Sequence, residues 1–368
     1  MIYLDHNATT PIDGRVLEAM MPYLQGLYGN PSSLYRLGRV ARSAVDCARE
    51  QVAALIDAPA SQILFTSSGT EANALALARA QNRRLWVSAI EHPAVFENAS
   101  KQPERYLEIN ILVADSSGKV LTQGIEGIKF QAGDFVSLML ANNEMGAIQD
   151  VLAFVEQLKG LGVIMHTDAV QALGKIPLSF RQLGVQLMSL SSHKIYGPKG
   201  CGALVRQAGV PLRPIMFGGE QEQGLRPGTE NVAAIVGFGK AAELARLEFD
   251  QRASLMSALR NRLEQQLKGI SGLVIFAEAV ERLPNTLQFG IPDVNGEMLL
   301  MQLDQKGIAV STGSACSAGS EHISPVLAAM GVDRGLAKSA IRVSLGKDNT
   351  ESEIDQFVSV LKTLLARH

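Results

Sequence analysis

The alternation of short apolar runs with helix-forming stretches constrains the fold of this 368-residue chain more than any other feature. The apolar runs that we predict as strands lie at 63–65, 84–88, 135–140, 163–166 and 187–190. Helix-forming stretches such as 71–80 and 151–160 separate several of these runs. Parallel strands need crossover connections, and helices usually supply them. The alternation therefore predicts an α/β fold with a mainly parallel sheet and helices on its faces.

The C-terminal third follows a different pattern. Residues from about 233 to 268 are nearly all helix formers, which predicts a long helix or a helix pair that connects two domains. Beyond it, we predict strands at 286–289, 308–310 and 341–345, and helices near 295–306, 323–330 and 351–366. This mixture predicts a smaller α+β domain, and the length of the chain also favours two domains.

Composition excludes several classes of protein. Hydrophobic residues make up 46% of the chain and charged residues 19%, which is typical of a globular enzyme and not of a disordered or fibrous chain. The formal net charge of −2 does not show the excess of basic residues that is typical of nucleic-acid-binding proteins. The N-terminus lacks the basic and apolar regions of a signal peptide, and no apolar run approaches the roughly 18 residues of a membrane span. We expect a cytoplasmic protein that binds neither nucleic acid nor membrane.

The turn from Ser67 to Thr70 lies between a predicted strand and a predicted helix, where a phosphate can bind. The N-terminus of a helix offers unpaired N–H groups and the positive end of a dipole. Gly69 allows close approach of the backbone, and Thr70 adds a hydroxyl donor. The same residues also fit an ordinary helix cap followed by an acidic first-turn residue, Glu71.

A lysine follows the strand that ends near Leu190 and precedes a Gly197-Pro198 turn. Open α/β sheets bind ligands at the carboxyl ends of their strands. A lysine that forms an imine with pyridoxal phosphate (PLP) needs this setting, so Lys194 is the candidate, with Ser191 and His193 as phosphate donors. The alternative is a solvated lysine in a surface turn.

Two further polar residues follow predicted strands. Asp168 is placed to pair with a protonated pyridine nitrogen, and Gln171 lies three residues on, within reach of the ring's phenolic oxygen. His92 follows the strand at 84–88 and is placed to lie against an aromatic cofactor and exchange protons near it. The alternatives are a helix-capping role for Asp168 and a structural role for His92.

The three cysteines are widely spaced, which argues against a disulfide framework and a four-cysteine zinc site. A free cysteine is usually buried and inert, and we expect this of Cys47 and Cys201. Cys316 is different because it lies in ten consecutive small residues, Ser311 to Ser320, which we expect to form a mobile loop. A thiol on such a tether suits movement between an active site and a partner.

An ordered set of motifs carries a family resemblance along essentially the whole chain. The motifs lie at 3–11, 29–33, 65–71, 91–92, 142–146, 168–171, 192–200, 226–229, 313–316 and 341–346. With them the chain resembles the cysteine desulfurases of the nitrogen-fixation and iron–sulfur-cluster type, a branch of the class V aminotransferase superfamily.

The resemblance implies a fold-type I PLP-dependent transferase that works as a homodimer. The large PLP-binding domain, with a seven-stranded type of sheet, would span 14–250. The small domain would combine 1–13 with 251–368 and carry the cysteine loop at about 311–322. The implied activity removes sulfur from L-cysteine, which gives L-alanine and a persulfide on Cys316. A sulfur-acceptor protein, such as an iron–sulfur scaffold, would then receive the sulfur.

The resemblance also implies roles for individual residues. Lys194 carries the cofactor as a Schiff base, and His92 stacks on the ring and manages the thiol protons. Asp168 pairs with the ring nitrogen, and Cys316 is the nucleophile. The remaining implied contacts are Asn143 and Gln171 to the ring hydroxyl, Gly69, Thr70, Ser191 and His193 to the phosphate, Thr229 to the phosphate of the other subunit's cofactor, and Arg342 and Asn30 to the substrate carboxylate.

The chain departs from the family pattern in two places. Asn73 stands where the family often has an acid, and Ala74 stands where it has asparagine. The chain also ends at His368, soon after its last predicted helix, whereas members that feed an iron–sulfur scaffold carry a further C-terminal docking segment. This favours the nitrogen-fixation-like subgroup as the expectation.

Three other interpretations stay open. A selenocysteine lyase or another class V aminotransferase would share the cofactor site, although the cysteine in a small-residue loop fits an aminotransferase poorly. A non-catalytic partner-binding protein could keep the fold. A nucleotide-binding enzyme is disfavoured, because there is no P-loop ending in Gly-Lys-Ser/Thr and no complete dinucleotide fingerprint.

Overall fold

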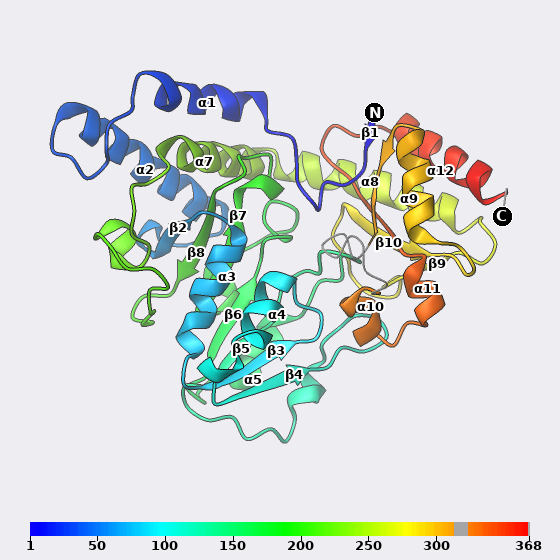
Figure 1. The fold of residues 1–368 in the computed structure, drawn as a ribbon, viewed down its shortest axis with the longest axis horizontal. Helices are drawn as coiled ribbons and strands as arrows, with labels where there is room; N and C mark the ends of the chain where they lie inside the picture. Colours follow the sequence, from blue (N-terminus) through cyan, green and yellow to red (C-terminus); the bar gives the residue numbers. More distant parts are fainter. Residues whose placement is uncertain (313–322, 367–368) are drawn as a thin grey trace.

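The computed structural model describes residues 1–312 and 323–366, and its central element is a seven-stranded sheet (Figure 1). The strand order is β2-β8-β7-β6-β5-β3-β4. The strands are β2 (Ile63–Thr66), β3 (Arg84–Ser88), β4 (Glu108–Leu112), β5 (Phe135–Ser137), β6 (Ile164–Asp168), β7 (Leu187–Ser191) and β8 (Gly202–Arg206). Only β8 runs against its neighbours β2 and β7, so all the other strands share one direction. The predicted mainly parallel sheet is confirmed.

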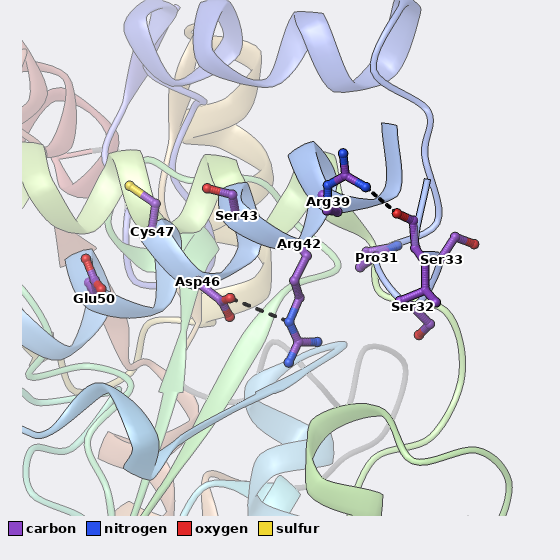
Figure 2. A pocket seen from close by; sticks show the side chains of 10 residues that line it. Pro31, Ser32, Ser33, Arg39, Arg42, Ser43, Asp46, Cys47 and Glu50 are labelled. Atoms are coloured by element: carbon purple, nitrogen blue, oxygen red, sulfur yellow. Dashed lines mark hydrogen bonds and ion pairs between the residues drawn. The ribbon is translucent and has the colours of Figure 1, made fainter. Parts of the chain in front are cut away.

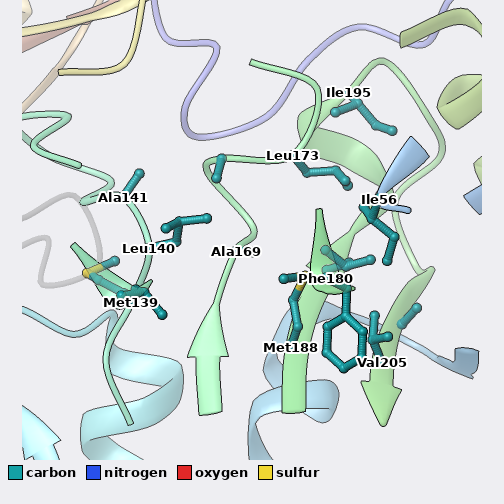
Figure 3. Close-up of a cluster of buried hydrophobic side chains, with 14 of the residues drawn as sticks. Ile56, Met139, Leu140, Ala141, Ala169, Leu173, Phe180, Met188, Ile195 and Val205 are labelled. Carbon is teal, nitrogen blue, oxygen red and sulfur yellow. The ribbon is translucent and has the colours of Figure 1, made fainter. Parts of the chain in front are cut away.

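Alternating side chains bury both faces of this sheet. Along β2 and β8, Leu64 and Leu204 join one hydrophobic cluster, whereas Phe65 and Val205 join the cluster of the opposite face. One face is covered by α3 (Gly69–Leu77) and α4 (Pro93–Ser100). The other is covered by α2 (Arg36–Leu55), α5 (Val151–Leu158), α6 (Phe180–Leu183) and α7 (Val232–Leu247), and α1 (Gly14–Gln25) packs on α7. Figure 3 shows part of this second cluster.

The C-terminal third builds a separate hydrophobic cluster around a four-stranded antiparallel sheet of order β12-β13-β10-β9. Its strands are β9 (Val274–Ile275), β10 (Thr286–Gly290), β12 (Ser311–Thr312) and β13 (Ile341–Ser344). The helices of this region are α8 (Phe249–Leu267), α9 (Gly296–Gln305), α10 (Pro325–Ala329), α11 (Arg334–Lys338) and α12 (Glu351–Leu365). The N-terminal strand β1 (Ile2–Tyr3) joins this region by pairing with β11 (Ile308–Ala309), and Leu4 is fully buried there.

Short 3-10 helices complete the described structure. They are η1 (Ala60–Gln62), η2 (Ala78–Ala80), η3 (Pro103–Arg105), η4 (Thr122–Ile125), η5 (Ser192–Lys194) and η6 (Gln221–Gly224). The most important of them for the site is η5, because it follows β7 directly and carries Lys194.

The structure decides between two alternatives predicted for the helical stretch from about 233 and corrects two other predictions. The stretch is a helix pair, α7 and α8, which meet at Glu248, where φ −104° and ψ 13° leave the helical range. The strand predicted to reach residue 140 ends at Ser137. Ser311 and Thr312, predicted as part of a loop, form β12 against β13, whereas the rest of that stretch, with Cys316, lies outside the described residues.

The prediction of two inert cysteines is half wrong. Cys201 is buried, with 2% of its surface exposed, but Cys47 is exposed. The buried face of α2 carries Ala41, Val45, Ala48 and Val52. Cys47 does not fall on this stripe, so its side chain faces outward.

Among residues 1–312 and 323–366, no helix is long and apolar enough to cross a lipid bilayer.

Candidate active site

Five chain segments meet at the carboxyl edge of the central sheet. Because β2, β3, β5, β6 and β7 run in one direction, the residues that follow them lie at the same edge. A cavity of about 210 Å³ opens there. It is lined by Ser68, Gly69, Thr70, Asn73, His92, Ala94, Met139, Asn143, Asp168, Val170, Gln171, Ser191, His193 and Lys194. The sequence-predicted site residues that this cavity brings together are Gly69, Thr70, His92, Asn143, Asp168, Gln171, Ser191, His193 and Lys194.

The N-terminal segment holds Lys194. Its Nζ donates to the carbonyl oxygens of Asn7, at 2.5 Å, and of Ala8, at 2.7 Å. The turn beyond it is tight, because Tyr196 has a φ of 70° and a Cβ on Gly197 would lie 2.0 Å from the hydroxyl of Ser192. The lysine therefore sits in a fixed turn and not on a solvated surface loop.

The carboxylate of Asp168 is buried and receives two hydrogen bonds. Asn73 Nδ2 donates to Oδ2 at 2.7 Å, and the backbone N–H of Val170 donates to Oδ1 at 2.9 Å. These two donors fix the orientation of the carboxylate. The contact with Val170 resembles the capping role considered for Asp168, but the residue also lines the cavity.

His92 is both a helix cap and a cavity residue. Its Nδ1 accepts a hydrogen bond from the N–H of Ala94 at 3.0 Å and caps α4, so the neutral ring carries its proton on Nε2. Burial lowers the pKa of His92; Asp168 opposes this, and the nearby cations Lys194 and Arg342 add to it. His92 therefore lines the cavity as a neutral imidazole whose Nε2–H can act as a donor.

His193 lines the cavity and bonds to the N-terminal segment. Its Nδ1 lies 3.1 Å from the hydroxyl of Thr9. Burial, together with the positive charges of Lys194 and Lys199, lowers the pKa of His193 to about 4. The neutral ring leaves Nε2 for a ligand.

The turn before α3 combines the two interpretations considered for it. Ser68 caps the helix, since its Oγ accepts from the N–H of Glu71 at 3.1 Å. Gly69 packs closely on the cavity wall, because an added Cβ would lie 3.0 Å from Val170 and 3.4 Å from Ser191. The cap leaves the other first-turn N–H groups for an anion at the positive end of the helix.

Three buried polar atoms of residues that line the cavity have no hydrogen-bond partner among the residues that the structure describes. They are the hydroxyl of Ser191, Oδ1 of Asn143 and Oδ1 of Asn73. Buried polar groups are normally satisfied, and unsatisfied ones at a cavity point to a missing polar ligand. Together with the helix N-terminus, Asp168 and Lys194, they suit a ligand that carries an anionic group at one end and a ring nitrogen at the other.

Arg342 lies beside the cavity on β13. Its Nη1 donates to the carbonyl of Asn143 at 3.0 Å, and its Nη2 donates to Asp5 Oδ1 at 2.7 Å. Its Nε is buried and has no partner within residues 1–312 and 323–366. One edge of the guanidinium is thus available for a further acceptor, which is what recognition of a carboxylate requires.

Asn30 and Thr229 do not line the cavity. Asn30 Oδ1 accepts from the N–H of Ser32 at 2.9 Å, and Thr229 is exposed. A larger hollow of about 490 Å³ begins at Pro31 and runs along α2 past Arg39, Arg42 and Cys47 (Figure 2). It includes none of the cavity residues around Lys194.

Four residues near the site were not singled out from the sequence. Asn7 and Lys175 contact Gln171, Glu91 lies next to His92, and Glu144 follows Asn143. Burial and the charge of Asp168 raise the pKa of Glu91 to about 8, and burial raises the pKa of Glu144 to about 7. Three of them lie inside motifs recognised from the sequence, but only the fold shows that their side chains are buried.

Comparison with known proteins agrees with this geometry. The family model described as aminotransferase class-V matches residues 2–357. A cysteine desulfurase of Nostoc sp. (strain PCC 7120) is 41% identical over 100% of this chain and 93% of its own length. The cysteine desulfurase IscS of Dictyoglomus turgidum is 39% identical over 100% of this chain and 95% of its own.

Solved structures give the same result. A NifS-like protein superposes with a TM-score of 0.93 at 38% identity and covers 100% of both chains. SspA, solved in complex with cysteine, superposes with a TM-score of 0.83 at 28% identity, covering 95% of this chain and 100% of its own. The chain belongs to the class-V aminotransferase family, among the cysteine desulfurases of the NifS and IscS type.

Proposed function

We propose that this chain is a PLP-dependent cysteine desulfurase that transfers the sulfur of L-cysteine to Cys316, and that the cavity around Lys194 is its active site. The observation that carries the proposal is the meeting of Lys194, Asp168 and His92 in one cavity at the N-terminus of α3. This is the set of groups that PLP chemistry needs: an amine, an anion for the ring nitrogen, an aromatic neighbour and a phosphate site. The relatives that match along the whole chain are named cysteine desulfurases, which is the activity proposed here.

The cavity residues fit the cofactor. The hydroxyl of Ser191, with Gly69, Thr70 and His193, would hold the phosphate, and Asn143 and Gln171 would approach the ring hydroxyl. Two of these residues have buried polar atoms that find no partner in the described part of the chain, Ser191 Oγ and Asn143 Oδ1. Asp168, held in place by hydrogen bonds from Asn73 and Val170, would pair with the ring nitrogen. When bound, PLP supplies an electron sink for the negative charge that develops on the substrate Cα.

The protein's own groups divide the remaining work. Arg342 binds the substrate carboxylate, with Asn30 as an additional contact, and Lys194 takes the proton from Cα. The thiolate of Cys316 attacks the substrate sulfur, so that a new S–S bond forms while the C–S bond breaks. The three-carbon fragment takes up protons and leaves as alanine. His92, neutral with its proton on Nε2, is placed to exchange protons with the thiols.

The proposal includes the assembly and its partners. The enzyme acts as a homodimer in which Thr229 reaches the phosphate of the other subunit's cofactor, and the exposed position of Thr229 supports this. The large domain spans 14–250, and the small domain combines 1–13 with 251–368. The persulfide sulfur passes to an acceptor protein for iron–sulfur cluster or other sulfur-cofactor synthesis.

The test is a product balance on PLP-loaded protein that is given L-cysteine and a reducing thiol. Equal amounts of alanine and sulfide are expected. Pyruvate and ammonia in place of alanine would show an elimination and remove Cys316 from the reaction. Rates with L-selenocysteine relative to L-cysteine separate the desulfurase from a selenocysteine lyase.

The nucleophile is tested by Cys316→Ala beside the matched variant Cys47→Ala. The first is expected to bind PLP and produce no persulfide, since the attacking thiolate is lost, and the second is expected to behave as wild type. Sulfide release by Cys316→Ala at the wild-type rate would show that Cys316 does not carry a persulfide in the reaction.

A further inference from the structure

Lys175 is a buried amine beside the proposed active site with no part in the mechanism above. It lies four residues after Gln171 and is only 5% exposed. Its Nζ donates to Oε1 of Gln171 and to Oδ1 of Asn7, each at 2.8 Å. A buried lysine is rare unless something requires it.

The contact with Lys175 determines how the amide of Gln171 is turned. Because Oε1 accepts from Lys175, Nε2 points the other way, where it donates to the carbonyl of Asn7 at 3.0 Å. An NH₂ group has two protons, so one remains for the cavity that Gln171 lines. Without Lys175, the amide could turn and present its oxygen instead.

The same amine fixes the segment that holds Lys194. The side chain of Asn7 accepts from Lys175 and from Asn285 Nδ2, at 3.0 Å, and donates to Thr286 Oγ1 at 2.8 Å. With the side chain held, the carbonyl of Asn7 stays where it accepts from Lys194 Nζ. Lys175 therefore contacts both Gln171, which is proposed to approach the ring hydroxyl, and Asn7, which contacts Lys194.

The surroundings of Lys175 favour the neutral amine. Burial lowers its pKa well below the ordinary range, and the positive charges of Lys194 and Arg342 act in the same direction. Its two acceptors are neutral amide oxygens.

We propose that Lys175 is a positioning residue of the desulfurase: it holds Gln171 with its Nε2 donor toward the cofactor's ring oxygen and holds Asn7 against Lys194. The inference rests on the proposed function, because it assumes PLP in the cavity. A donor aimed at the ring oxygen stabilises the ionised form of that oxygen. Loss of the donor favours the protonated form of the bound cofactor.

The experiment is a pH titration of the visible absorbance of bound PLP in wild type, Lys175→Met, Gln171→Met and the double variant. Each single variant is expected to raise the pH midpoint by roughly half to one unit, the scale of one hydrogen bond. The shift in the double variant is expected to lie well below the sum of the two single shifts, because Lys175 acts on the ring oxygen through Gln171, and any shift beyond that of Gln171→Met reports its contact with Asn7. Lys159→Met removes an exposed lysine of α5's C-terminus and should leave the midpoint unchanged.

The outcomes separate this inference from the function on which it rests. A wild-type protein that neither binds PLP nor releases alanine overturns the proposed function and the inference with it. A desulfurating wild type whose midpoint is unaffected by Lys175→Met overturns the inference alone, as does an additive double variant. If Lys175→Met does not fold, the direction in which Gln171→Met shifts the pH midpoint decides. A lowered or unchanged midpoint would mean that Nε2 of Gln171 does not face the ring, which overturns the inference.

Discussion

Asn73 donates a hydrogen bond from Nδ2 to Oδ2 of Asp168 across 2.7 Å, between side chains that are 1% and 5% exposed. Asn73 stands at a position where the cysteine desulfurases that this chain resembles often have an acid. In this chain a neutral amide therefore stabilises the aspartate that is proposed to hold the ring nitrogen, without adding a second negative charge. The pair joins α3, which carries the proposed phosphate site, to the end of β6.

Replacing Asn73 with leucine is expected to weaken PLP binding roughly 10- to 100-fold, because a hydrogen bond to a charged group is worth about 1.5–3 kcal/mol. Asp168 keeps the contact with Val170, so binding is reduced and not abolished. PLP affinity is measured by fluorescence titration of the apo protein. The same exchange at the exposed Asn261 of α8 is the control, and equal affinities for the two variants would contradict the role of Asn73.

Arg342 and Asp5 form a second informative pair, since the proposed substrate-binding arginine already has an anionic neighbour at 2.7 Å. Arg342→Lys loses the planar fork that grips a carboxylate, so we expect KM for L-cysteine to rise about 10-fold or more with a smaller change in kcat. Asp5→Asn removes the competing charge, and KM is expected to fall. Steady-state kinetics separate the two parameters. An unchanged KM in Arg342→Lys would place carboxylate binding elsewhere.

The main features of the fold and part of the site could be predicted from the sequence. The strands at 63–65 and 187–190 are buried on both faces, and such strands are visible in the sequence as mostly apolar runs. Parallel strands end at one edge, so the polar residues after them, Asp168 and Lys194, were expected to meet. The structure brings both to the same cavity.

The rest depends on contacts between distant parts of the chain. Asn7 meets Lys175 across 168 positions because the N-terminal segment folds back along the sheet edge, and no local pattern reports this. The reversed strand β8 is also a tertiary feature, since its residues would suit either direction. The exposure of Cys47 could have been predicted from the sequence. Positions 41, 45, 48 and 52 define the buried stripe of α2, and residue 47 falls outside it. The division into two domains stays a prediction.

Glu144 is expected to make the stability of the apo protein depend on pH. It is buried, accepts a hydrogen bond from Ser324 at 2.6 Å, and its pKa is raised from 4.5 to about 7, chiefly by burial. The folded state therefore keeps a proton that the unfolded state releases, and the free energy of unfolding falls as the pH rises from about 4.5 through about 7. Glu144→Gln removes this dependence while keeping size and an acceptor.

Urea unfolding of wild type and Glu144→Gln at pH 5, 6.5 and 8 provides the measurement. The stability of the variant relative to wild type should increase across this range. His6 and His193, whose pKa values are lowered to about 4, act in the opposite direction in both proteins and cancel in the comparison. Glu126→Gln, on an exposed residue, should leave the pH profile of wild type intact. If the free energies of unfolding of wild type and Glu144→Gln changed with pH in the same way, the raised pKa of Glu144 would be contradicted.

The cysteines are expected to differ in reactivity. Burial raises the pKa of the Cys201 thiol, which lies in the large hydrophobic cluster, whereas Cys47 is exposed along α2. A thiolate is the reactive species, so an alkylating reagent should modify Cys47 in the folded apo protein and leave Cys201 intact. The proposed role of Cys316 adds it to the reactive set.

Mass spectrometry of peptides after brief alkylation identifies the modified thiols. Cys47→Ser should retain the label on Cys316 and full desulfurase activity, and Cys316→Ala should retain the label on Cys47 and lose activity. Labelling in denaturant should reach Cys201 as well, which shows that protection came from the fold. Modification of Cys201 in the folded protein as fast as Cys47 would contradict its burial. A persulfide found on Cys47 during turnover would mean that sulfur reaches a surface thiol, and that the product balance must be repeated in Cys47→Ser.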